Sequence, residues 1–229
     1  MAAVQETLVW DAPVRVAHWA LALSVAGAWL TAEAEGWRLL HITLGYTAGA
    51  LVLLRLLWGV VGTRHARFVD FVRGPHAVLA YLQRLAAGRA PRYLGHNPAG
   101  AVVIVLLLGL GLLVPLSGWA MLNDLGAEAL EELHELLAQA MLLLVGVHVA
   151  GVLLASWRHR DKLVAAMVTG RKRAEPGQPG IRWSWWPLGV LLLAGVLGFW
   201  LVQWRAAPQG GLVQPERVLA SERASQDED

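Results

Sequence analysis

The chain has 229 residues, of which 56% are hydrophobic and only 16% charged, with a formal net charge of +2 at pH 7. This is the composition of a membrane protein, and we expect lipid and no nucleic acid around it. The complete absence of cysteine excludes disulfide bonds, cysteine-ligated zinc and covalent attachment of haem through a C-x-x-C-H motif.

Five apolar runs are long enough to cross a hydrocarbon core of about 30 Å as helices at about 1.5 Å per residue. Their Gly, Ala and Leu content, without strict alternation, excludes the strands of a β-barrel. The first run has no Lys or Arg before Arg15 and contains His18, so we expect it to be retained rather than cleaved as a signal peptide. We therefore predict an all-α membrane protein with spans at 13–31, 39–61, 99–122, 133–157 and 183–204.

The charges of the connecting segments predict the orientation. Segments 62–98 and 156–182 are rich in arginine and lysine, whereas segment 123–132 carries Asp124, Glu128, Glu131 and Glu132 with no basic residue. The positive-inside rule places the N-terminus in the cytoplasm and, with five spans, the C-terminus outside.

Composition also divides the chain into regions. Residues 1–173 form the expected helical bundle, with a short amphipathic helix at about 75–88 lying on the inner membrane face. Residues 174–182 read as a cytoplasmic linker and 183–204 as the fifth helix. The acidic tail at 205–229 is polar, poor in aromatic residues and expected to be disordered.

Four histidines lie inside the predicted spans. His134 and His148 are fourteen residues apart, which in a left-handed bundle is two whole heptads, so both face the same way at two depths about 21 Å apart. His18 lies in the inner half of the first span and His41 near the outer end of the second. The pairs that can meet are therefore His18 with His148 and His41 with His134.

Ionisable residues at membrane depth are costly and usually mark function, although single histidines also occur with ordinary hydrogen bonds. Zinc would require three or four ligands, usually including carboxylate or thiolate, and the acids lie at the outer rim. Haem iron needs only two axial ligands from the protein. Small residues near the histidines would leave room for a flat porphyrin: Ala22, Gly45, Gly49, Ala138 and Gly151.

Arg55 lies fourteen residues after His41, on the same helix face and at the depth of the inner histidine pair. It is either an arginine that reaches the inner interface or the partner of an anionic haem propionate. Arg15 and Arg38 are alternatives for the second role.

Several segments resemble the bacterial cytochrome b561 family and its relative, the b-type cytochrome subunit of membrane-bound nickel-iron hydrogenases. They are "WDAPVRVAHW", "HITLGY" with Arg55 downstream, "YLGHNPAGA", "SGWAM", "HELLAQAMLLLVGVHVAG" and "HRDKLVAAMVTGRKR", which together cover about residues 8–173 in order. The resemblance implies a four-helix bundle in the bacterial inner membrane. It also implies two non-covalent b haems on His18, His41, His134 and His148.

Two imidazoles per iron leave no open coordination position, so simple electron transfer is favoured over oxygen chemistry. We expect electron exchange between the quinone pool, with ubiquinone as a candidate substrate, and an extracytoplasmic redox protein such as a c-type cytochrome. Two alternatives stay open: a superoxide oxidase that passes electrons to quinone, and a haem-bearing anchor with a partner redox subunit of a dehydrogenase or hydrogenase. The acidic outer loops would repel a small anion and disfavour the superoxide oxidase.

Overall fold

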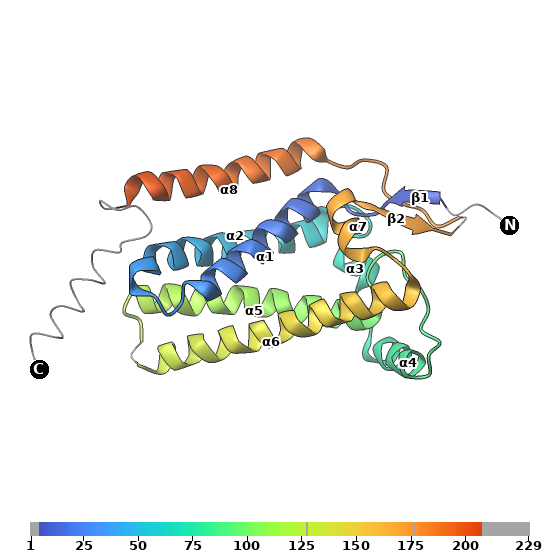
Figure 1. The fold of residues 1–229 in the computed structure, drawn as a ribbon, viewed down its shortest axis with the longest axis horizontal. Coiled ribbons are helices and arrows are strands. Elements are labelled where there is room, and N and C mark those ends of the chain that lie inside the picture. Colours follow the sequence, from blue (N-terminus) through green and yellow to red (C-terminus); the bar gives the residue numbers. More distant parts are fainter. Residues whose placement is uncertain (1–4, 127, 176, 208–229) are drawn as a thin grey trace, which may run out of the picture.

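The computed structural model describes residues 5–126, 128–175 and 177–207, and within them the chain is mostly helical (Figure 1). The elements, in chain order, are β1 (Gln5–Leu8), α1 (Ala12–Leu30), η1 (Glu35–Trp37), α2 (Arg38–Val61), α3 (Phe68–Phe71), α4 (Pro75–Ala86), α5 (Pro98–Leu122), α6 (Glu128–His159), α7 (Leu163–Thr169), β2 (Arg171–Ala174) and α8 (Trp186–Ala206).

The five long helices run along the long axis of the molecule, and the short elements gather at one end (Figure 1). We call this end, with β1, β2, α3, α4 and α7, the sheet end. The opposite end, where the chain turns from α1 to α2 and from α5 to α6, is the turn end. The closely packed helix pairs are α1 with α2, α2 with α5, α5 with α6, and α1 with α8. Helices α1 and α6 are not such a pair.

Four described helices are long and apolar enough to cross a membrane, namely α2, α5, α6 and α8. Their apolar side chains are mostly exposed outwards, as expected for surfaces that face lipid. The 19-residue helix α1, the first of the five predicted spans, falls outside this group. It is short, and Arg15 and His18 lower its mean hydropathy.

The mostly helical structure agrees with the predicted all-α class, but the sheet end adds a two-stranded sheet that the sequence did not indicate, in which β1 pairs antiparallel with β2 from Gln5 opposite Ala174 to Leu8 opposite Arg171. The strands have only four residues each, and β2 reads Arg-Lys-Arg-Ala, so neither has the apolar alternation that marks a strand in sequence. The helices between them bring the two segments together. The adjoining segment also follows β1, since the N–H of Ile181 donates to the carbonyl of Leu8 at 2.8 Å.

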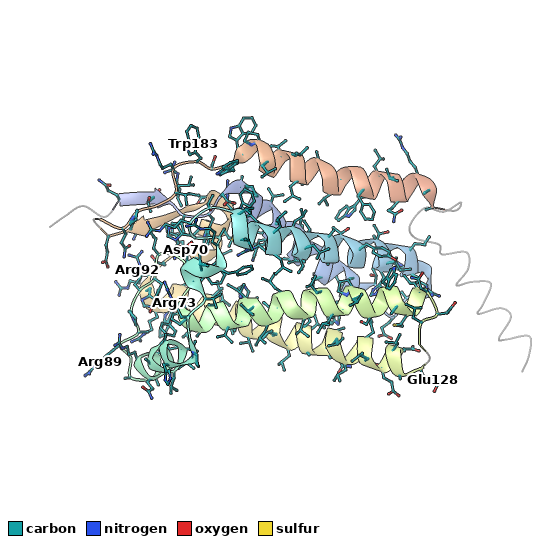
Figure 2. The ribbon with its side chains drawn as sticks, turned by 180° about the vertical axis from the view of Figure 1, so that it is seen from behind. Asp70, Arg73, Arg89, Arg92, Glu128 and Trp183 are labelled. Atoms are coloured by element: carbon teal, nitrogen blue, oxygen red, sulfur yellow. The ribbon has the colours of Figure 1, made fainter. Side chains whose placement is uncertain are left out.

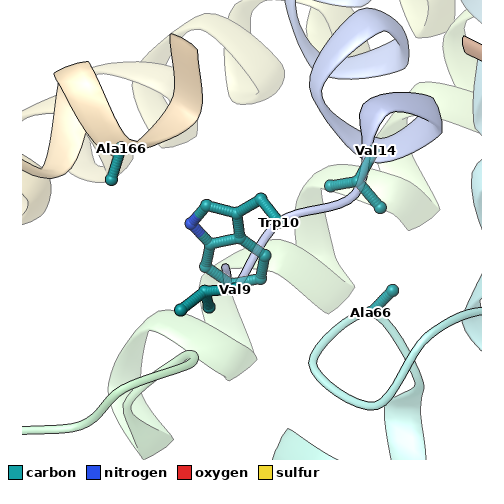
Figure 3. Close-up of a cluster of buried hydrophobic side chains, with 5 residues drawn as sticks. All are labelled: Val9, Trp10, Val14, Ala66 and Ala166. Atoms are coloured by element: carbon teal, nitrogen blue, oxygen red, sulfur yellow. The ribbon is translucent and has the colours of Figure 1, made fainter. Parts of the chain in front are cut away.

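A small core closes the sheet end and fixes where α1 begins (Figure 3). It contains Val9, Trp10, Val14, Ala66 and Ala166, which come from the segment just before α1, the first turn of α1, the loop after α2, and α7. Because these segments pack on one another, the first turn of α1 is held against the end of α2.

Asp11, which is fully buried, adds polar bonds to the same junction. One carboxylate oxygen caps α1 by accepting from the N–H of Val14 at 2.8 Å. The other oxygen accepts from Trp58 Nε1 at 2.9 Å and from Thr63 Oγ1 at 2.5 Å. Asp11 therefore fixes the rotation of α1, and with it the direction in which His18 points.

The loop before α5 is fastened to the sheet by two cations. Arg92 forms a bidentate ion pair with Asp161, at 2.7 and 2.6 Å, and also donates to the carbonyl of Arg173. The buried ammonium of Lys172 donates to the carbonyls of Tyr93 at 3.1 Å and Leu94 at 2.7 Å. Burial lowers the pKa of Lys172 to about 8.

The remaining segments relate simply to the sequence predictions. Helix α4 occupies the region of the expected amphipathic helix, ending at Ala86, and Gly88 follows with a φ of 74°, a conformation that favours glycine. Helix α8 corresponds to the predicted fifth span. The predicted acidic tail lies outside the described residues, apart from its first three, 205–207.

Candidate haem-binding sites

The structure brings the four predicted histidines together in two pairs. His18 of α1 faces His148 of α6 with 6.4 Å between ring centroids, near the sheet end. His41 of α2 faces His134 of α6 with 6.3 Å between ring centroids, near the turn end. We call these the sheet-end pair and the turn-end pair. These are the same two pairs that we inferred from the depth of each histidine in its predicted span.

The spacing within each pair fits a metal ion between the rings. Two metal–nitrogen bonds of about 2 Å each, one to each imidazole, can be accommodated in such a separation. The described residues contain no cluster of three or more His, Asp or Glu side chains able to hold an ion by themselves. Two imidazoles without further ligands suit a metal whose other positions are filled by a macrocycle, which is the case for haem iron.

Both rings of the turn-end pair are oriented by hydrogen bonds. The Nδ1 of His41 lies 2.8 Å from the carbonyl oxygen of Ala28, which can only accept, so this nitrogen carries the proton. The Nδ1 of His134 lies 2.9 Å from Ser117 Oγ. Each bond leaves the Nε2 of its ring free to bind a metal, and partners of this kind orient metal-bound histidines generally.

The sheet-end pair differs in this respect. The Nδ1 of His18 is buried and has no hydrogen-bond partner among the residues that the structure describes. The next residue, Trp19, is held instead, because its Nε1 donates to the carbonyl of Met167 at 3.2 Å. The described imidazoles of the two pairs therefore differ in their hydrogen bonding.

The glycines near the histidines give a test of the available room. A Cβ built on Gly45 or on Gly151 would meet no atom within 4 Å, so each leaves open space beside its helix. A Cβ on Gly49 would lie 3.1 Å from Pro115, so this glycine serves the contact between α2 and α5. Gly45 and Gly151 therefore leave their helices uncrowded, whereas Gly49 is used for helix packing.

Two of the three arginines predicted as possible propionate partners, Arg15 and Arg55, lie at the sheet end, and each has a buried nitrogen without a hydrogen bond to the described residues. Arg55 donates from Nη2 to the carbonyl of Ala66 at 3.0 Å and lies 5.3 Å above the ring of Phe68, while its Nη1 is buried with no partner in the described part of the chain. Arg15 donates from Nη1 to the carbonyl of Val168 at 2.5 Å, and its Nε is buried without a partner. The third candidate, Arg38, is exposed at the start of α2 near the turn end.

Sequence reasoning missed the setting of His96, which it assigned only to a basic loop. The ring lies between Trp10 and Phe71, with 4.6 Å between centroids on each side, and its Nδ1 is buried without a partner. Burial and then the nearby charges of Arg55 and Lys172 lower the pKa of His96. His96 lies in the segment "YLGHNPAGA", but nothing in that segment indicated contact with Trp10.

Sequence reasoning also missed Ser117 as a partner of His134, seventeen residues away on another helix. Its only signal was its place in "SGWAM". The acidic residues Asp124, Glu128, Glu131 and Glu132 are exposed at the turn end, and Figure 2 shows Glu128 there, far from Arg73, Arg89 and Arg92 at the sheet end. The molecule thus carries opposite charges at its two ends.

Comparison with known proteins agrees with this chemistry. The chain is 24% identical over 215 residues to a probable Ni/Fe-hydrogenase B-type cytochrome subunit of Rhizobium leguminosarum bv. viciae, covering 73% of this chain and 89% of that protein. It is 22% identical over 214 residues to the protein of the same name from Bradyrhizobium diazoefficiens, covering 72% and 85%. No solved structure matches significantly. Residues 9–170 match the family model of prokaryotic cytochrome b561, and the chain belongs to this family of b-haem electron-transfer proteins of the membrane.

Proposed function

We propose that this cytochrome carries electrons across the membrane through two b haems, one between His18 and His148 and one between His41 and His134. It exchanges them between the quinone pool and an extracytoplasmic redox protein. The observation that carries this proposal is the presence of two facing imidazole pairs fourteen residues apart along one helix, α6. One site near each end of a membrane-spanning helix is the arrangement that a transmembrane electron carrier requires.

The ligation favours electron transfer over chemistry at the metal. Each bound haem supplies an iron that accepts and returns one electron. The two imidazoles of each pair would hold the iron of a bound haem, and the hydrogen bonds of His41 and His134 hold their rings in place. Rigid ligands favour electron transfer because little rearrangement accompanies a change in oxidation state.

The charges support an orientation with the sheet end in the cytoplasm. Arginines and lysines concentrate there, whereas the exposed acids of the α5–α6 turn lie at the other end (Figure 2). In this orientation α1 also spans the membrane beside α2 and α8, completing five spans. The turn-end pair then faces the extracytoplasmic side and the sheet-end pair faces the cytoplasm.

The relatives make a partner redox subunit a specific second candidate for the electron donor. Both of the curated relatives described above are named as B-type cytochrome subunits of Ni/Fe-hydrogenases. An extracytoplasmic hydrogenase-like subunit would deliver electrons at the turn end, as a soluble c-type cytochrome would accept or deliver them there. The two cases differ in lifetime, because a subunit co-purifies and a soluble carrier does not.

The direct test is purification of the full chain with a reduced-minus-oxidised visible spectrum and a haem-to-protein ratio. We expect the spectrum of a low-spin b-type cytochrome and a ratio of about two, one haem for each imidazole pair. A ratio near one would show that only one of the two sites binds haem. A colourless protein would contradict the proposal as a whole.

Arg55→Leu is expected to keep both haems but to lower the reduction potential of the sheet-end haem. The Nη1 of Arg55 is buried without a hydrogen-bond partner among the described residues, and its positive charge at the sheet end would stabilise a reduced, more electron-rich haem there. Redox titration of the purified protein measures the change.

Two matched variants make the Arg55 result specific. Arg55→Lys keeps the charge and should keep the potential close to that of the wild type. Arg73→Leu removes an exposed arginine from the same end of the molecule and should leave both potentials in place. An unchanged sheet-end potential in Arg55→Leu would show instead that Arg55 only reaches the interface.

Neutralising the acidic turn end is expected to slow electron exchange with a basic soluble cytochrome. A cluster of exposed acidic side chains attracts a basic partner and speeds its association. Salt weakens this attraction, strongly so near 0.1 M, where the Debye length is about 10 Å. The measurement is stopped-flow oxidation of the reduced protein by a basic c-type cytochrome at low and high ionic strength.

The variant for this measurement replaces Glu128, Glu131 and Glu132 together by glutamine. Glu175→Gln, an exposed acid at the sheet end, is the matched control and should leave the rate unchanged. A rate that does not depend on salt or on the three glutamates would favour a fixed partner subunit over a soluble carrier.

A further inference from the structure

We propose that Ser117 of α5 lowers the reduction potential of the turn-end haem by accepting a hydrogen bond from the ring of His134. This inference rests on the proposed function in one respect, the ligation of that haem by His134. Ser117 would not touch the iron or the porphyrin. It acts through the ligand, as a positioning residue.

The direction of the hydrogen bond follows from the surroundings of the hydroxyl. Ser117 Oγ lies 2.9 Å from the carbonyl oxygen of Val114 and 2.9 Å from Nδ1 of His134. The carbonyl can only accept, so the single hydrogen of the hydroxyl points to Val114. Towards the imidazole, Oγ can then only accept, and Nδ1 of His134 must carry the proton. This tautomer directs the lone pair of Nε2 to the metal.

The backbone of α5 holds the hydroxyl close to the ring. Ser117 is buried, with 6% of its surface exposed. A Cβ built on the next residue, Gly118, would lie 3.2 Å from Cε1 of His134, so a side chain at this position would press on the ring. The pair Ser117–Gly118 thus supplies one polar contact and one close approach to the same imidazole.

The effect on potential follows from the charge on the ligand. An imidazole that donates a hydrogen bond from Nδ1 gains negative character and becomes a stronger base at Nε2. A stronger base stabilises the oxidised iron more than the reduced iron, which lowers the potential. His41 receives the same support from the carbonyl of Ala28, whereas Nδ1 of His18 at the sheet end has no partner. The serine hydroxyl is the part of this support that a side-chain substitution can remove.

The experiment compares Ser117→Ala with Ser117→Thr in the full-length, haem-loaded protein, with the wild type alongside. Threonine keeps the hydroxyl and can still bond to a carbonyl in the preceding helical turn. Potentiometric titration gives the midpoint of each haem, and electron paramagnetic resonance of the oxidised protein reports the ligand field of each iron. The haem-to-protein ratio is measured on every sample.

We expect Ser117→Ala to shift the midpoint of the turn-end haem upwards and to change its resonance signal, with both haems retained and the sheet-end midpoint unchanged. Ser117→Thr should restore the wild-type midpoint. An unchanged midpoint in Ser117→Ala at full haem content would overturn the proposal, as would loss of that haem, which would make the serine purely structural. A wild-type protein with no turn-end haem would contradict the proposed function instead, and the haem ratio separates the two failures.

Discussion

Replacing either histidine of one pair by alanine is expected to remove one haem and to leave the other in place. His18→Ala and His148→Ala should each lose the sheet-end haem, and His41→Ala and His134→Ala should each lose the turn-end haem. An iron left with one imidazole keeps only half of its protein ligation and is held poorly. The measurements are the haem-to-protein ratio, expected to fall from about two to about one, and the redox titration of the remaining haem.

The pairing itself is tested by comparing the four variants. Within each pair the two variants should give the same difference spectrum and the same remaining midpoint. His76→Ala, which removes an exposed histidine of α4, is the matched control and should keep both haems. If His18→Ala matched His41→Ala rather than His148→Ala, the histidines would be paired in another way.

Asp11→Ala is expected to destabilise the whole sheet end. The buried carboxylate accepts three hydrogen bonds, and bonds to a charged group contribute about 1.5–3 kcal/mol each. Alanine also removes the cap of α1, which is worth about 1 kcal/mol, and leaves the half-buried donors of Trp58 and Thr63 without this acceptor. We expect the free energy of unfolding to fall by at least about 3 kcal/mol. Thermal unfolding in detergent, followed by circular dichroism, measures the loss.

A second variant separates the helix cap from the contacts with α2. Asparagine caps helices as well as aspartate, so Asp11→Asn should keep the start of α1 but lose an acceptor towards Trp58 and Thr63, and we expect an intermediate loss. Asn97→Asp, at the cap of α5, exchanges one good cap for another and should change stability little. Unfolding of Asp11→Ala at the wild-type temperature would contradict the importance of this junction.

The helices and the partners within each histidine pair could be predicted because both depend on regular geometry. Long apolar runs fix a helix and its length, and fourteen residues return a side chain to the same face, so His134 and His148 had to share one side of α6. The family resemblance, confirmed by the match over residues 9–170, pointed to the same haem chemistry.

The features that could not be predicted arise from contacts between distant segments. Strand β2 is a strand only because β1 lies beside it, and the paired residues are more than 160 positions apart in the chain. Ser117 meets His134 through the packing of α5 on α6, and Asp11 meets Thr63 through the packing of α1 on α2. The two members of each contact lie far apart in the sequence, so the periodicity of a local segment cannot reveal the contact.

The pairing of β1 with β2 also sets an order on the biosynthesis of the protein. A ribosome releases Gln5–Leu8 before the described helices but Arg171–Ala174 only after α6 and α7, so strand β1 pairs with its partner only after these helices have been made. Until then α1 lacks the sheet that joins its start to the segment after α6. The side of the bundle between α1 and α6 is therefore not joined by the sheet while the helices that carry the paired histidines are synthesised, and it closes only after that synthesis is complete.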